Sequence, residues 1–265
     1  LLFFLIPLFL SLYFILDFKI LIFTTGLSFF IPSLLLIKKN EIFFFNSQMK
    51  IDKSLIKRWI KFGIPLSVWS SLGLLLSFLD RYFINKYSNL ESLGIYSSLS
   101  ELSIKIFSLF IFPFTLAIHP RITKKWNENK KKDAIVLIKL SILAVVVALL
   151  LSIFFLLKFD MELFKIITIF IPIEGLENAN LLFPLFITGL VWQLSFFTQK
   201  LIELKEKTYL MIIFILISVL INIAGNTIYL PRYGIIATSY ASMISSLSYC
   251  FLTFIYFLLR KNTEA

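Results

Sequence analysis

The sequence predicts an all-α integral membrane protein with about eight transmembrane helices. Hydrophobic residues make up 59% of its 265 residues, and 31 residues are Phe, a composition far more apolar than that of a soluble domain. The apolar residues fall in runs of about 20, the helix length that crosses a hydrocarbon core of roughly 30 Å. Such runs are too long for barrel strands, which need only about 9–11 alternating residues.

Eight apolar runs define the expected spans, and charged or turn-forming segments separate them. In order, the spans are residues 1–16, 18–37, 62–84, 91–119, 134–157, 179–202, 209–230 and 234–259. The connection at 158–180 is itself rich in Phe, Ile and Leu, so we expect it to lie partly on the membrane surface. The chain opens on an apolar run without Met or a basic leader, which argues against a signal peptide and indicates a truncated protein.

The segment 41–61 differs from the spans because apolar and basic residues alternate in it at helical spacing. Ile51, Leu55, Trp59 and Phe62 recur among Lys and Arg, which predicts an amphipathic helix at the membrane interface before the third span. A basic anchor that fixes topology explains this pattern more simply than a specific lipid or partner site.

The distribution of Lys and Arg predicts the orientation, because basic loops stay on the cytoplasmic side. One set of alternate connections, together with the C-terminus, carries 18 of the 26 basic residues, and the other set carries 6. The first set is therefore assigned to the cytoplasm. This spread also accounts for the net charge of +11 without a nucleic-acid partner, which would need basic residues gathered on a soluble face.

Enzyme signatures are missing from the sequence. Cys250 is the single cysteine and His119 the single histidine, so there is no cysteine or histidine cluster for a metal. Phosphate-binding loops, zinc-protease motifs and the nucleophile elbow of the α/β-hydrolases are absent too. We therefore assign no catalytic residue, no metal and no cofactor.

A polar stripe runs along the fourth expected span. At 100° per residue its members lie within about 40° of Glu101. They are Gly94, Ser97, Glu101, Lys105, Ser108, Thr115 and His119. Glu101 and Lys105 sit near mid-membrane with the i, i+4 spacing that favours an ion pair. They either lock two helices together or, as the length of the stripe favours, line a hydrated cavity or bind a charged substrate.

The third span ends in LDRYFI, where Asp80 and Arg81 continue a face of small and polar residues that includes Ser77. At this depth long side chains can snorkel to water, so the cost of charge falls. The pair is read either as a structural salt bridge or as a gating or substrate contact. On the sixth span Thr188, Trp192, Ser195 and Gln199 share a face, while the small residues of the last span indicate helix packing.

Several motifs in this order resemble the bacterial polysaccharide and O-antigen repeat-unit flippases of the multidrug/oligosaccharidyl-lipid/polysaccharide (MOP) exporter superfamily. In the segment 62–122, GIP opens a span, LDRYFI closes it and LGIYS opens the next, which ends at a proline before the Lys-rich KKWNENKKKDA. Near the C-terminus, YLPRYGIIATSYASMISSLSY is similar to the family's outer turn and the helix that follows it.

The resemblance implies two six-helix lobes that move an undecaprenyl-pyrophosphate-linked oligosaccharide across the bacterial cytoplasmic membrane by alternating access. Residues 62–265 would form the complete second lobe, 38–61 a cytoplasmic linker, and 1–37 the last two helices of a truncated first lobe. The expected partners are that lipid-linked substrate, membrane lipids and polysaccharide-assembly proteins.

The resemblance also suggests roles for the polar residues. Lys105 and Arg81 would attract the pyrophosphate, and Glu101 would carry a coupling proton or sodium ion. The remaining cavity candidates are Asp80, Ser77, Ser108, Thr115, Gln199 and Trp192. The alternatives are a drug or cation extruder of the same superfamily, a polysaccharide polymerase or ligase, and a non-transporting scaffold fragment.

Overall fold

The computed structural model describes residue 30 and residues 53–171 and 173–260 of a chain that divides into two units, 1–53 and 54–265. The second unit is described here. The described elements are α3 (Lys53–Tyr87), α4 (Leu90–Asn127), α5 (Lys131–Phe170), the 3₁₀ helix η1 (Leu176–Leu181), α6 (Leu182–Thr198), α7 (Lys200–Leu204), α8 (Tyr209–Tyr233) and α9 (Ile235–Arg260). The first two expected spans and most of the linker 38–61 lie outside the described residues.

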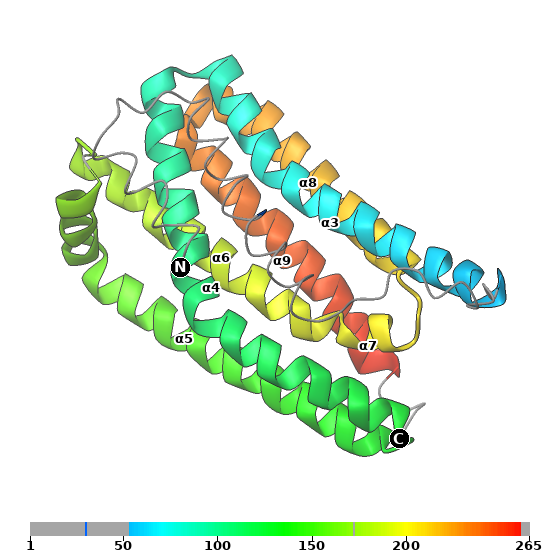
Figure 1. Ribbon diagram of the computed structural model, residues 1–265. Helices are drawn as coiled ribbons and strands as arrows, with labels where there is room; N and C mark the ends of the chain where they lie inside the picture. The colour runs from blue at the N-terminus through cyan, green and yellow to red at the C-terminus, as the bar shows by residue number, and fades with distance from the viewer. Residues whose placement is uncertain (1–29, 31–52, 172, 261–265) are drawn as a thin grey trace. The chain divides into compact units, whose positions relative to one another are not determined.

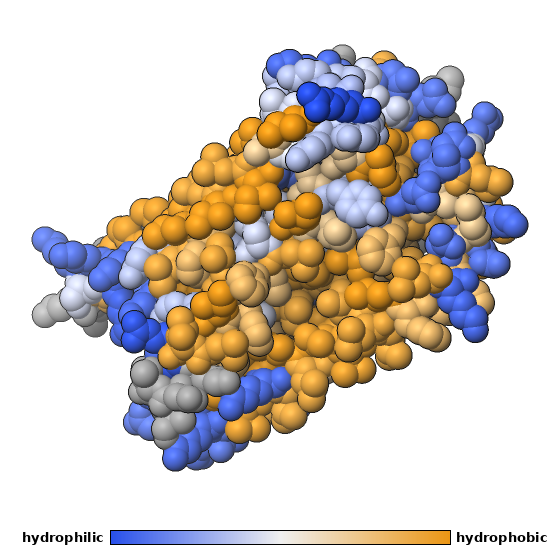
Figure 2. Space-filling model, turned by 180° about the vertical axis from the view of Figure 1, so that it is seen from behind, coloured by the Kyte–Doolittle hydropathy of each residue, from blue (hydrophilic) through white to orange (hydrophobic). Residues whose placement is uncertain are grey.

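Six of the described helices or helical segments are long and apolar enough to cross a membrane: α3, α4, α5, the segment Leu176–Leu204, α8 and α9. Each coincides with one expected span from residue 62 onward, so the all-α membrane class is confirmed, whereas the total of about eight spans stays a prediction. Figure 2 shows hydrophobic residues across the middle of one face and hydrophilic residues toward its ends, as a bilayer requires.

Helices α6 and α9 form the centre of the unit, between the α4–α5 pair and α8 (Figure 1). In the most apolar stretch of the segment Leu176–Leu204, which contains α6, 78% of the residues are buried, against 6% in the corresponding stretch of α3. The α4–α6 contact is close, since a Cβ added at Gly189 would lie 3.1 Å from the Ser103 carbonyl oxygen. The central helices are therefore fixed by packing, while α3 is held through a few side chains.

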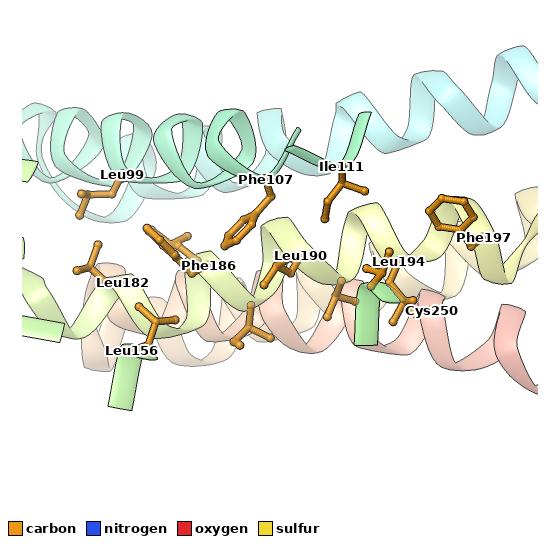
Figure 3. Close-up of a cluster of buried hydrophobic side chains, with 14 of the residues drawn as sticks. Leu99, Phe107, Ile111, Leu156, Leu182, Phe186, Leu190, Leu194, Phe197 and Cys250 are labelled. Atoms are coloured by element: carbon orange, nitrogen blue, oxygen red, sulfur yellow. The ribbon is translucent and has the colours of Figure 1, made fainter. Parts of the chain in front are cut away.

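A continuous apolar core joins α4, α5, α6 and α9 (Figure 3). Phe107 of α4 meets Phe186 of α6 edge to face, with ring centroids 5.5 Å apart, a favoured aromatic geometry. Leu156 of α5 and Cys250 of α9 close the same cluster. Lipid tails are as apolar as these side chains, so close packing stabilises the core more than removal from water does.

Short turns make successive helices antiparallel. Asn89 separates α3 from α4 and accepts a hydrogen bond from the Ser92 amide at 2.7 Å, which caps α4. Gly234 ends α8 with φ +65°, a conformation that glycine adopts readily. As a result α3 and α8 begin, and α4 and α9 end, at one end of the unit, called here the Lys-rich end. Its basic residues come from 53–61, 121–132 and 200–207 and from Arg260.

Two connecting segments are more helical than expected. Residues 53–61, expected in a separate interfacial helix, form the first turns of α3. The connection after the fifth span continues α5 to Phe170, with non-helical backbone only at Phe159. In both segments apolar residues recur at helical spacing, so the helix of the neighbouring span extends into them.

The contact between α8 and α9 gives a stability prediction. A Cβ added at Gly225 would lie 2.8 Å from the Ala241 Cβ, whereas one added at Gly94 would meet nothing within 4 Å. Gly-to-Ala in a helix ordinarily stabilises by about 0.5–1 kcal/mol. We therefore expect Gly94→Ala to raise the unfolding temperature in detergent and Gly225→Ala to lower it. Equal shifts for the two variants would contradict this packing.

Candidate functional site

Asp80 is the centre of a buried polar cluster that joins α3, α4, α8 and α9. Its side chain is only 5% exposed. Asn222 and Asn226 of α8 donate from their Nδ2 atoms to Asp80 Oδ1 at 2.9 and 3.0 Å. Tyr96 of α4 donates to Oδ2 at 2.7 Å, and Ser242 of α9 donates to the same oxygen. Four donors from three helices thus satisfy one carboxylate, as a buried charge requires.

The cluster also has spare acceptor capacity. The Oδ1 atom of Asn226 is buried without a hydrogen-bond partner. Carboxylate, amide and hydroxyl oxygens are the ligands of hard cations, and all three types meet here. Among the described residues no group of three acidic, His or Cys side chains gathers. A single carboxylate among neutral oxygens suits a proton or a monovalent cation such as sodium.

A cavity of about 90 Å³ adjoins the Asp80 cluster. It is bounded by polar and small residues of α3, α4, α6 and α9, among them Ser77, Ser100, Thr188, Ser242, Ser245 and Ser246, with Trp192 on one side. A space this size holds a few water molecules or a small ion. It is too small for an oligosaccharide.

Asp80 and Arg81 do not pair with each other. Neighbouring residues on a helix point about 100° apart, so Asp80 faces the cluster while Arg81 faces α4. There the Arg81 Nη2 donates to Glu101 Oε1 at 2.6 Å. This corrects two expected pairings, Asp80 with Arg81 and Glu101 with Lys105. Lys105 is exposed and has no ion pair among the described residues.

The other expected site residues lie in four places. Ser77 and Trp192 border the Asp80 cavity. Thr115 lines a separate hollow of about 860 Å³ near the Lys-rich end, together with His119 and Lys124, and Ser108 donates to the Lys105 carbonyl at 3.0 Å. Gln199 is buried and accepts from Tyr249 at 2.6 Å. The structure thus brings Asp80, Ser77 and Trp192 together and separates Gln199 and Thr115 from them.

The partners of Asp80 on α8 were not predicted from the sequence. Asn222 and Asn226 are spaced i, i+4 within an otherwise apolar span, so both lie on one face. Two amides on one face of a membrane helix indicate a buried polar contact. That signal could have identified them, although it does not indicate which helix they meet.

A second ion pair connects α3 to the segment before α8. Arg58 donates to Glu206 at 2.5 Å, and both side chains are largely exposed. The hydrogen bond and charge of Arg58 hold the pKa of Glu206 below its usual range. An exposed pair of this kind contributes little to stability, but it links the Lys-rich end of α3 to the bundle.

Comparison with known proteins defines the class. The fold is similar to that of a MATE protein crystallised as a point mutant, with 13% identity and a TM-score of 0.72 over 91% of this chain and 55% of that one. It is also similar to MATE in complex with MaL6, with 13% identity and a TM-score of 0.67 over 91% and 56% of the two chains. The chain therefore shares the fold of these MATE proteins and spans about half of their length.

The sequence itself matches a family. Residues 1–126 match the model of the polysaccharide biosynthesis protein family, and no curated protein matches the chain. A MOP superfamily transporter from Pyrococcus furiosus is similar in fold, with 14% identity and a TM-score of 0.62 over 77% of this chain and 45% of that one. The first 126 residues thus match a polysaccharide biosynthesis family, and the fold resembles those of MATE and MOP superfamily proteins.

Proposed function

We propose that the full-length protein exports an undecaprenyl-pyrophosphate-linked oligosaccharide by alternating access and couples this export to a proton or monovalent cation at Asp80. The observation that carries the proposal is the buried Asp80 cluster beside a cavity in a transporter fold. An ionisable residue inside a membrane bundle costs at least ~2.5 kcal/mol, so its retention points to ion or substrate handling.

The substrate class is supported by the family match. Polysaccharide biosynthesis needs carriers that move lipid-linked sugars across a membrane. The Asp80 cavity of about 90 Å³ suits the ion and excludes the sugar, so the sugar would bind on the surface that carries Arg81, Glu101 and Lys105. This assignment moves the coupling ion from Glu101, which Arg81 neutralises, to Asp80.

The same proposal gives an orientation. The Lys-rich end would face the cytoplasm of a bacterial cell, together with the C-terminus, because basic segments stay on that side of the cytoplasmic membrane. The oligosaccharide would enter from this side and leave at the opposite end. Polysaccharide-assembly proteins would then receive it there, while membrane lipids surround the apolar faces.

Alanine variants of two basic residues on this surface test substrate binding. Arg81→Ala and Lys105→Ala in the full-length protein should each lower surface polysaccharide about tenfold, since a hydrogen bond to a charged group contributes ~1.5–3 kcal/mol. Lys139→Ala, an exposed Lys on α5, is the matched control for Lys105. Glu101→Gln breaks the Arg81 ion pair but keeps the Arg81 charge, so it should retain export. Normal polysaccharide in both alanine variants at normal protein levels would refute the assignment.

A drug or cation extruder is the second candidate, because two of the similar structures are MATE proteins. The exposed carboxylate of Glu101 would then attract a cationic substrate. In that case Glu101→Gln would abolish export of a dye cation from loaded vesicles, and Arg81→Ala would increase it. Loss of polysaccharide in Arg81→Ala with unchanged dye export would exclude this candidate.

A further inference from the structure

Three aromatic rings from three helices form a layer on the Lys-rich side of the Asp80 cavity. Trp69 of α3 stacks on Trp192 of α6 with centroids 6.4 Å apart and planes inclined by 10°. Tyr249 of α9 lies 5.8 Å from Trp192 and 6.4 Å from Trp69. Phe196 meets the edge of Trp69 at 6.3 Å. We call Trp69, Trp192 and Tyr249 the ring layer.

Polar groups lie on both sides of the ring layer. On one side is the cavity, where Ser245 and Ser246 of α9 continue from Ser242 of the Asp80 cluster. On the other side the Tyr249 hydroxyl donates to Gln199 at 2.6 Å, and Gln199 donates to Glu203 at 3.1 Å. The buried polar face of α9 is thus interrupted by an apolar layer about one ring thick.

Close approach of α3 completes the layer. Gly73 lies one helical turn from Trp69, and a Cβ added there would lie 3.0 Å from Trp192 Cζ2. The residue at 73 therefore sets how closely α3 covers Trp192. The polar contacts of α3 with the rest of its unit include the Asp80 cluster, the Arg81–Glu101 pair and the Arg58–Glu206 pair. The Phe62 carbonyl also accepts from Thr208 at 3.3 Å, and apolar side chains such as Ile84 pack into the core.

We infer that the ring layer is a gate, closed in this structure, between the Asp80 cavity and the Lys-rich end. The inference rests on the proposed alternating access and deepens it, since an ion bound at Asp80 would reach one side of the membrane at a time. A hydrophobic constriction one ring thick blocks water and ions. Movement of α3 away from Trp192 would open it, because α3 is much less buried than its two neighbours: 6% of the most apolar stretch of α3 is buried, against 78% in the segment that contains α6 and 39% in α9.

The position of the layer, rather than its packing, indicates a gate. Its rings pack with Ile202, Met211 and Ile215 in an apolar cluster of their own. That cluster lies between two polar groups about two helical turns apart on α9, from Ser242 to the Tyr249 hydroxyl, roughly 10 Å. Removal of one ring should therefore join the cavity to the polar groups at the Lys-rich end.

Thiol labelling tests the gate without any substrate. Cys250, the only cysteine, is replaced in a Cys250→Ser background, and Ser77→Cys places a reporter in the cavity. A cationic methanethiosulfonate is added to sealed vesicles in which a protease-accessible C-terminal tag shows that the Lys-rich end faces the reagent. We expect Trp192→Ala to speed labelling at position 77 at least about tenfold, corresponding to a fall of about 1.4 kcal/mol in the opening free energy.

Three further variants make the outcome decisive. Trp192→Phe keeps a ring at this position, so its labelling rate should equal that of the parent. Phe155→Ala removes an exposed ring that packs on Phe159 of α5, and its labelling rate should also equal that of the parent. Gly73→Ala, which pushes α3 away from Trp192, should also speed labelling at position 77. It replaces Trp192→Ala as the test variant if Trp192→Ala does not fold. Parental rates in both Trp192→Ala and Gly73→Ala would overturn the gate. The proposed substrate would stand, because its test is polysaccharide export.

Discussion

Replacing Asp80 by Asn is expected to abolish ion-driven export in the full-length protein while preserving the fold. The amide has the shape of the carboxylate but brings an NH₂ group against the donors Asn222 and Asn226, which lie 2.9 and 3.0 Å from Asp80 Oδ1. It also removes the one negative charge of the cluster. Loss of one buried, hydrogen-bonded charge costs ~2–5 kcal/mol, so ion affinity should fall at least about thirtyfold.

The measurement is export into inverted vesicles, driven in turn by a proton gradient and a sodium gradient. The gradient that drives the parent identifies the ion, and Asp80→Asn should respond to neither. Asp160→Asn is the matched control, because Asp160 is on α5, which contributes no residue to the Asp80 cluster, and accepts only the Met161 amide among the described contacts. Asp80→Glu tests geometry, since it keeps the charge and displaces it. Gradient-driven export by Asp80→Asn would show that the ion binds elsewhere.

The apolar helices expected from residue 62 onward are present in the structure, because the bilayer imposes a strong rule on sequence. Any helix that crosses the hydrocarbon core needs about 20 apolar residues, so the spans can be identified without knowing their neighbours. Helix ends were harder to place. α3 begins at Lys53 and α5 continues to Phe170, since backbone hydrogen bonding can continue into an amphipathic segment beyond the bilayer.

The candidate site could not be predicted fully, because a helical wheel shows the direction of each side chain but not the helix that it contacts. Asp80 and Arg81 were expected to act together, yet one turns to Asn222 on α8 and the other to Glu101 on α4. The direction of each side chain follows from helix geometry, but its partner follows from which helices pack together. The roles of Lys105 and Ser108 in binding stay predictions, because nothing in the structure tests them.

A buried ion pair at the Lys-rich end gives the second large expected effect, on the stability of the protein. Lys200 donates to Glu203 at 2.8 Å, with side chains only 10% and 18% exposed. Gln199 donates to the other Glu203 oxygen at 3.1 Å. Removal of one member of a buried ion pair costs about 3–5 kcal/mol because the other charge stays buried without its partner. We expect Lys200→Met to lower the unfolding free energy in detergent by about 3 kcal/mol.

The double variant Lys200→Met/Glu203→Gln should recover most of that loss, since it leaves no unpaired charge and keeps an acceptor for Gln199. Replacement of a buried pair by neutral residues is often neutral for stability, so recovery is the decisive observation. Lys124→Met with Glu128→Gln is the exposed comparison, a pair 3.9 Å apart whose loss should change little. If the double variant at 200 and 203 is no more stable than Lys200→Met alone, the lost Lys200 contacts, rather than the unpaired charge, cause the instability. If it is more stable than the parent, the pair is retained at a cost in stability, and the Tyr249–Gln199–Glu203 network beneath the ring layer becomes the place to look for its benefit.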